Sequence, residues 1–352
     1  MVVKDRHEGL HQCLNSVKSL CDEIIIVNLG SSEKTKKTVQ EFTNKIFDFK
    51  EINNLAAAKN FAFSHATMDY ILWLDADDYL LEEDQLKFRE LKKYLNTTID
   101  AVSMICQMEF DEYGNPSLIY TSNRIVKRGN HVKWKGTVDE YLEVSGTIYR
   151  SDVAIRKSDK TTPSQNDQSL FFYEHRLMNG EIFSPTDLYY YANALKAHAR
   201  LRKAIMYYKE FLNTQKGRIE DQIQACINMA ECYKELGEVI KEKESLVMSF
   251  IYDTPRPEVS CRLGDLQKEK GEYKKAIIWY CLAIEKDSES TDGIRKIDYS
   301  TWYPHLQLCF CYWQIGEKKK SVEHNNKAKV YKPNDSQVMY NDQFFKEYFS
   351  HK

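Results

Sequence analysis

The chain has 352 residues, and its 50 Lys and Arg against 52 Asp and Glu give a formal net charge of −2. This near balance argues against a nucleic-acid binder held by a basic face, and only 13 Gly and 7 Pro exclude a collagenous or linker-rich chain. The length predicts two or three domains. Eight of the 23 tyrosines fall in residues 1–180 and fifteen in 181–352, which indicates two halves built on different plans.

Targeting and membrane signals are weak throughout the chain. The longest apolar runs, residues 24–27 and 70–74, fall far short of the roughly 20 residues that a membrane helix needs. Residues 4–12 are polar and charged, so no signal peptide is expected. Nine cysteines without a CxxC pair indicate buried free thiols in a reducing compartment. Together these features predict a cytoplasmic protein with no transmembrane segment.

The first half alternates strand and helix patterns. The apolar runs predict strands at residues 1–3, 24–27, 45–49, 70–74 and 101–105, with helices between them. Further strands at 108–113, 117–127 and 131–135 are expected to be antiparallel. The alternation predicts a mainly parallel sheet covered by helices, whose ligands bind at the carboxyl ends of the strands. Asn28 follows one such strand, and Asp75, Asp77 and Asp78 follow another.

The second half is helical and internally repeated. Small residues recur twelve positions apart, as in the pairs Ala192/Ala204, Gly264/Ala276 and Cys309/Ser321. The predicted units begin near residues 185, 223, 257 and 302, which resembles the tetratricopeptide repeat with its period of about 34 residues. An unrelated helical bundle is the alternative. We therefore predict three segments: an α/β domain over 1–155, a connecting segment over 156–184 and an all-α repeat domain over 185–352.

The strongest local signal is the acidic group Asp75, Asp77 and Asp78 directly after a buried strand. Three carboxylates there are costly unless something positive binds them. Such oxygen ligands suit Mg²⁺ or Mn²⁺, which usually complete their shell with ligand phosphates. The alternative is a plain strand-to-helix turn in which Asp77 or Asp78 caps a helix.

The order of segments resembles family 2 glycosyltransferases of the GT-A fold, an α/β, Rossmann-like architecture. The matching segments are residues 3–5, 13–17, 22–32, 57–62 and 69–78, the last of which looks like the family's DxD signature. A transferase domain followed by tetratricopeptide repeats is similar to a bacterial subgroup that resembles the transferases that glycosylate bacteriocin peptides.

The resemblance implies roles for individual residues. Lys4 and Asp5 would line the nucleotide pocket, and Lys59 would replace an Arg beside the ribose and diphosphate. Asn28 stands where the family usually has an Asp facing the base. Asp75 would contact the nucleotide sugar, while Asp77 would hold the divalent metal, Mn²⁺ or Mg²⁺, with Asp75 beside it.

A second candidate site lies in residues 134–142, a segment that reads W-x-G-x-V-H-E in the similar subgroup. Glu140 matches the Glu of this pattern, and Asp139 replaces its His. An inverting transfer needs a carboxylate that takes the proton of the acceptor, and we predict Glu140 for that role. Asp139 is the rival base or an extra metal contact. Arg124 and Trp134 are candidates to contact donor or acceptor, although Arg124 fits a surface strand position equally well.

The sequence therefore predicts a metal-dependent inverting glycosyltransferase of the hexosyltransferase type, with a UDP-sugar as the favoured donor. The repeats would present a peptide or protein acceptor, and their apolar residues would allow a homodimer. Four departures support the alternative of a repeat scaffold with a degenerate transferase domain: the short first strand, Asn28, Asp139, and residues 155–157 where a further His is expected. A Mg-dependent phosphohydrolase is the remaining alternative.

Overall fold

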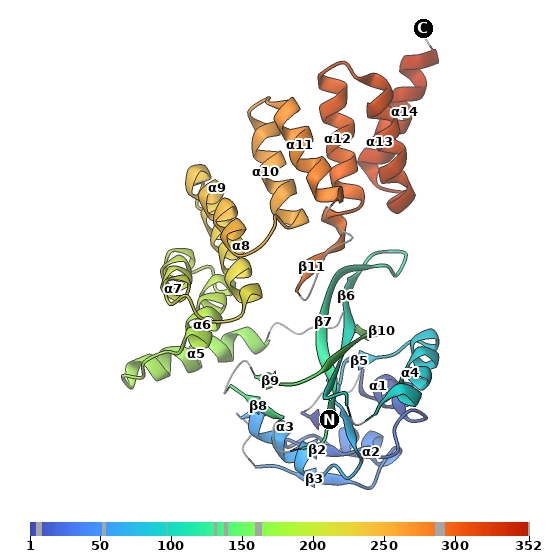
Figure 1. Ribbon diagram of the computed structural model, residues 1–352, viewed down its shortest axis with the longest axis vertical. Helices are drawn as coiled ribbons and strands as arrows, with labels where there is room; N and C mark the ends of the chain where they lie inside the picture. Colours follow the sequence, from blue (N-terminus) through green and yellow to red (C-terminus); the bar gives the residue numbers. More distant parts are fainter. Residues whose placement is uncertain are drawn as a thin grey trace. The chain divides into compact units, whose positions relative to one another are not determined.

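The computed structural model describes residues 1–4, 9–50, 54–96, 98–129, 132–136, 140–158, 164–285 and 293–350. The chain divides into two compact units, Met1–Pro163 and Ser164–Lys352. The first is α/β and the second is helical (Figure 1), as the sequence predicts. The predicted connecting segment, residues 156–184, contains the end of the last long strand of the first unit and the helix α5 (Ser164–Met178).

The first unit contains a small parallel sheet made of β1 (Val2–Val3), β2 (Ile26–Asn28) and β3 (Ile46–Asp48), in the order β1-β2-β3. The pairing places Val3 opposite Asn28 and Asn28 opposite Asp48. The ends of these three strands therefore lie side by side. The predicted parallel arrangement is confirmed for this part of the unit.

The second sheet of this unit is mixed, which differs from the mainly parallel sheet expected. Its path β7-β6-β10-β5 contains one parallel pair, β6 with β10, while β4 and β5 pair antiparallel with β7 and β10 respectively. The predicted strands at 101–105 and 108–113 are one strand, β6. The strands are β4 (Tyr70–Leu72), β5 (Asp78–Tyr79), β6 (Ala101–Phe110), β7 (Pro116–Lys127) and β10 (Ile148–Lys157). A separate hairpin pairs β8 (Lys133–Lys135) with β9 (Tyr141–Glu143).

Four helices pack on these sheets: α1 (Leu10–Val17), α2 (Glu33–Gln40), α3 (Leu55–Ser64) and α4 (Glu82–Tyr94). Leu10 and Leu14 of α1 pack with Val3 and Ile26, which fixes this helix against the small sheet. Burial of such side chains contributes about 1.5–3 kcal/mol each. The helix α3 begins at the cap Asn54, whose side chain accepts a hydrogen bond from the amide of Ala57.

The second unit consists of consecutive antiparallel helix pairs (Figure 1). Three of the predicted repeat starts are confirmed at Pro185, Pro257 and Trp302, whereas the second repeat begins at Ile219 rather than near 223. The helices are α6 (Pro185–Ala197), α7 (Leu201–Asn213), α8 (Ile219–Glu235), α9 (Val239–Met248), α10 (Pro257–Glu269), α11 (Tyr273–Glu285), α12 (Trp302–Gln314), α13 (Lys318–Tyr331) and α14 (Ser336–Ser350). Short η1 (Ser249–Ile251), β11 (Arg295–Lys296) and η3 (Ile297–Tyr299) segments lie between them.

Small residues let the paired helices approach closely. A Cβ built on Gly264 of α10 would lie 2.8 Å from a ring carbon of Tyr280 on α11, so a larger residue would displace that ring. The tyrosines Tyr191, Tyr208 and Tyr280 are fully buried. Packing between helices, the predicted reason for the tyrosine excess of the second half, therefore holds for these three residues.

Two further expectations can be compared with the described residues. All nine cysteines are free thiols, as predicted, and seven of them are buried. Across the described ranges, none of the helices combines the length and apolar character that crossing a membrane requires.

Candidate active site

The acidic group follows β4 and sits in a tight loop. The amide of Trp73 donates to the carbonyl of Arg124, and its indole N–H donates to the carbonyl of Asn123 at 2.7 Å. The amide of Asp78 donates to the carbonyl of Asp75, while Asp78 Oδ2 accepts the amide of Asp75 at 2.9 Å. These hydrogen bonds close the loop, so Asp78 stabilises the loop conformation.

The N-terminal end of helix α1 packs against this acidic loop. A Cβ built on Gly9, just before the helix, would lie 3.1 Å from the carbonyl oxygen of Ala76. The thiol of Cys13 donates to the carbonyl of Asp75 at 3.4 Å. Burial, followed by the charge of Asp78, raises the pKa of this thiol well above its ordinary value. Cys13 is therefore a supporting residue and not a thiolate nucleophile.

Asp78 and Arg124 form a buried ion pair. Arg124 Nη1 lies 2.7 Å from Asp78 Oδ2, and both side chains are at most 1% exposed. The guanidinium also stacks on the Trp73 ring, 3.9 Å from its centroid. Arg124 is thus not a surface strand residue, and the alternative that placed it there is wrong. Burial raises the pKa of Asp78, and the charge of Arg124 opposes that shift.

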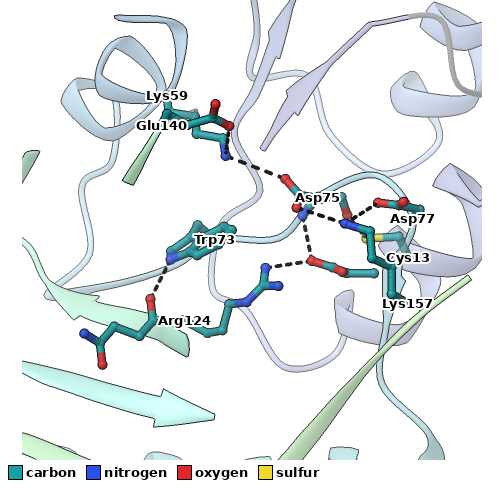
Figure 2. Close-up of polar contacts among 10 residues, drawn as sticks. Cys13, Lys59, Trp73, Asp75, Asp77, Arg124, Glu140 and Lys157 are labelled. Atoms are coloured by element: carbon teal, nitrogen blue, oxygen red, sulfur yellow. Dashed lines mark hydrogen bonds and ion pairs between the residues drawn. The ribbon is translucent and has the colours of Figure 1, made fainter. Parts of the chain in front are cut away.

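Asp75 and Asp77 face two lysines (Figure 2). Lys157 Nζ lies 3.5 Å from Asp75 Oδ2 and 3.6 Å from Asp77 Oδ1, and Lys59 Nζ lies 3.7 Å from Asp75 Oδ1. Burial alone would raise the pKa of Asp75, but Lys59, Arg124 and Lys157 together hold it below its usual range. Burial alone would lower the pKa of Lys157, and the three aspartates raise it instead, Asp75 most strongly.

Lys59 links the acidic loop to the second candidate segment. Its ammonium contacts Glu140 Oε1 at 2.8 Å and Asp75 at 3.7 Å, so one side chain joins both predicted sites (Figure 2). The same ammonium lies 4.0 Å from the centroid of Trp134 and 5.1 Å from that of Trp73. These two indoles pack edge to face at 4.7 Å. The residues that the structure brings together here are Lys59, Asp75, Asp77 and Glu140.

Other predicted residues lie at the neighbouring strand ends. Asn28 at the end of β2 is buried; its amide donates to Asp48 Oδ1 at 2.6 Å and its oxygen accepts the amide of Ser31 at 2.8 Å. Lys4 follows β1 directly and is exposed. Asp5 and Asp139 lie outside the described residues.

Sequence reasoning missed three residues that shape the site. Lys157 reaches the aspartates because β10 pairs with β5, which places it opposite Asp78. Asn60 exchanges two hydrogen bonds with the backbone of Trp134, both at 2.9 Å, and so ties β8 to α3. The Trp73 ring contacts two cations, Lys59 at 5.1 Å and Arg124 at 3.9 Å from its centroid. The one sequence signal for Lys157 is its place in residues 155–157, where a further histidine is expected.

The carboxylates fit a hard divalent cation. One oxygen from each of Asp75, Asp77 and Asp78 lies within 4.8 Å of the others. Asp78 Oδ1 is buried and has no hydrogen-bond partner among the described residues, which leaves an acceptor to be filled. Oxygen donors of this kind are the preferred ligands of Mg²⁺ and Mn²⁺. Lys157 contacts two of the same side chains.

Comparisons with known proteins agree with this geometry. Residues 1–155 match the model of the family described as glycosyl transferase family 2. Glycosyltransferase SunS of Bacillus subtilis (strain 168), described as SPbeta prophage-derived, is 22% identical over 235 residues, which cover 63% of this chain and 54% of that protein. A TPR repeat-containing protein of Synechococcus elongatus is 38% identical over 89 residues, covering 25% of this chain and 22% of that protein.

Solved structures include other repeat proteins. The chain resembles YrrB, a TPR protein described as having an unusual peptide-binding site, at 12% identity and a TM-score of 0.39, over 51% of this chain and 84% of that one. The chain matches about half the length of SunS and less than a quarter of the Synechococcus protein. The order of parts that the sequence predicts agrees with these findings: the match to the family 2 glycosyltransferase model lies in the first unit, and the second unit consists of consecutive helix pairs.

Proposed function

We propose that this chain transfers a sugar from a nucleotide-sugar donor to an acceptor, with inversion at the sugar carbon. The observation that carries the proposal is the single cluster in which Lys59 joins Asp75 to Glu140 within a family 2 domain. The family match favours this function over the phosphohydrolase alternative. Because several residues depart from the family pattern, the competing function is a repeat scaffold with a degenerate transferase domain.

The donor would bind to Asp75 and Asp77 and to residues at the ends of the neighbouring strands. Asp77 and Asp75 would hold Mn²⁺ or Mg²⁺, which when bound neutralises the leaving diphosphate. Lys59 is placed to contact the donor beside Asp75, and Asn28, Lys4 and Asp5 would line the nucleotide. UDP is the nucleoside diphosphate that the family resemblance favours.

Glu140 is the general base of the proposed reaction. Its carboxylate takes the proton of the acceptor nucleophile as the acceptor bonds to the sugar carbon and the bond from that carbon to the diphosphate oxygen breaks. The leaving electron pair goes to the nucleoside diphosphate. The transition state resembles an oxocarbenium ion, as in glycoside hydrolysis. Asp139, adjacent in sequence, is the alternative base or a metal contact.

The helix pairs of the second unit would bind the acceptor and present it for transfer. Stacked helix pairs form extended surfaces that suit a peptide or protein segment. Exposed apolar side chains such as Ile240, Ile251 and Ile278 also offer contacts for a second copy of the chain. We propose a peptide or protein acceptor and a homodimer on these grounds.

The test is nucleotide-sugar hydrolysis by the full chain across UDP-, GDP-, ADP- and dTDP-sugars, with Mn²⁺ and with EDTA. We expect one donor class to be hydrolysed, and Asp77→Asn to lower its rate about a hundredfold or more, since one charged contact to the transition state is lost. Asp69→Asn, a change at an exposed aspartate of the same unit, should keep the wild-type rate. No hydrolysis or binding of any donor would support the scaffold account instead.

A further inference from the structure

Lys157 holds a position inside the acidic cluster that the proposed mechanism has not used. Its ammonium lies at nearly equal distances, 3.5 and 3.6 Å, from carboxylate oxygens of Asp75 and Asp77 (Figure 2). The side chain is 21% exposed, so a ligand can reach it. The same two carboxylates are the residues that would hold a divalent metal.

The backbone fixes this placement. Lys157 is the last residue of β10, and strand pairing sets it opposite Asp78 of β5. The next residue, Ser158, donates its amide to the carbonyl of Asp77 at 2.9 Å. The backbone position of Lys157 therefore depends on the strand register and not on a loop conformation.

The charges of the cluster leave Lys157 available for a phosphate. Arg124 is fully buried against Asp78 and Trp73, and Lys59 is paired closely with Glu140. Among the described residues, the ion pairs of Lys157 are longer, at 3.5 and 3.6 Å, and are shared between two aspartates. When the Arg124–Asp78 pair is left aside, three carboxylates remain beside two lysines, which gives a net charge of −1. These groups are Asp75, Asp77, Glu140, Lys59 and Lys157. An ammonium is a compact cation that binds phosphate oxygens well.

We propose that Lys157 is a diphosphate-binding residue that competes with the divalent metal for Asp75 and Asp77, so that a nucleoside diphosphate also binds without metal. The inference rests on the proposed donor site. Removing the ammonium leaves both aspartates without that cation. A metal should then bind more tightly, and metal-free diphosphate binding should weaken.

The test is titration calorimetry of the full chain with UDP, GDP, ADP and dTDP, in EDTA and in Mn²⁺, followed by titration of Mn²⁺ alone read by electron paramagnetic resonance. With the tightest nucleotide in EDTA, Lys157→Met should bind at least about tenfold more weakly than wild type. Lys157→Arg, which keeps the charge, should stay within about threefold. Mn²⁺ alone should bind to Lys157→Met about fivefold or more tightly than to wild type, because one repelling charge is gone.

The matched control is Lys93→Met, which removes a lysine from an exposed ion pair with Glu90 on α4 and should change neither affinity. Rescue by Lys157→Arg separates loss of charge from misfolding. If wild type binds the nucleotide only with Mn²⁺, and Lys157→Met matches it in both titrations, the inference is wrong while the donor site stands. If wild type binds no nucleotide in either condition, the inference and the proposed function fail together.

Discussion

The two units bury polar side chains in different ways. In the first unit the largest fully buried side chain is a charged one, Arg124, paired with Asp78 and stacked on the Trp73 ring. In the repeat unit the largest are neutral, among them Tyr208 and Tyr280 between paired helices. Buried charge is costly and is retained where it does something specific, whereas a hydrogen-bonded hydroxyl costs little. The largest fully buried side chain is therefore charged in the first unit, where the candidate site lies, and neutral in the second.

The largest expected effect on stability comes from breaking the buried pair. Arg124→Met leaves Asp78 buried without its cation, and we expect the first unit to lose about 3–5 kcal/mol in its free energy of unfolding. Hydrogen exchange read by mass spectrometry would follow each unit separately. Arg218→Met, which removes an exposed pair with Asp221 in the repeat unit, should cost less than about 1 kcal/mol. Equal losses in the two variants would contradict the distinction between the units.

A steric change should affect the repeat unit alone. Gly264→Ala places a Cβ against the Tyr280 ring, and overpacking of this kind costs about 1–3 kcal/mol. Thermal unfolding and hydrogen exchange at α10 and α11 would measure the loss. Gly129→Ala is the matched control, because a Cβ there meets nothing within 4 Å. Wild-type stability of Gly264→Ala would show that the helix pair is looser than described.

A third expected effect on stability is a pH dependence of the repeat unit. The rings of His305 and His324 meet at 2.9 Å between their Nδ1 atoms, with Tyr312 stacked on His324 and Lys327 and Glu323 nearby. Burial lowers the pKa of each histidine from 6.5 to about 4, and His324 and Lys327 add to the effect on His305.

The sign of that dependence follows from where protons bind. Between pH 6.5 and pH 4 the unfolded histidines take up protons that the folded pair does not, so stability is full above pH 6.5 and falls as the pH drops toward 4. We expect a loss of about 2 kcal/mol over this range, after allowing for solvent screening. His305→Gln should flatten the profile of melting temperature against pH. Parallel profiles for the two proteins would contradict the assignment.

Local patterns predicted the acidic group and most strands before residue 136, because these features depend on consecutive residues. The strands β5, β9 and β10 were not predicted. The cross-chain contacts could not be read in this way. Glu140 meets Lys59 across 81 residues, and Lys157 reaches Asp75 only through the pairing of β10 with β5. The second repeat starts at Ile219 and not near 223, since that degenerate unit lacks a clear start signal.

The central claim is that one cluster both binds the donor and carries the base. Release of nucleoside diphosphate by Glu140→Gln, measured beside donor affinity, tests it most directly. We predict a rate lowered about a hundredfold or more at unchanged donor affinity. Glu143→Gln, three residues along in β9 and paired with the exposed Lys135, should behave as wild type. A Glu140→Gln protein that releases the nucleoside diphosphate within twofold of the wild-type rate would contradict the account.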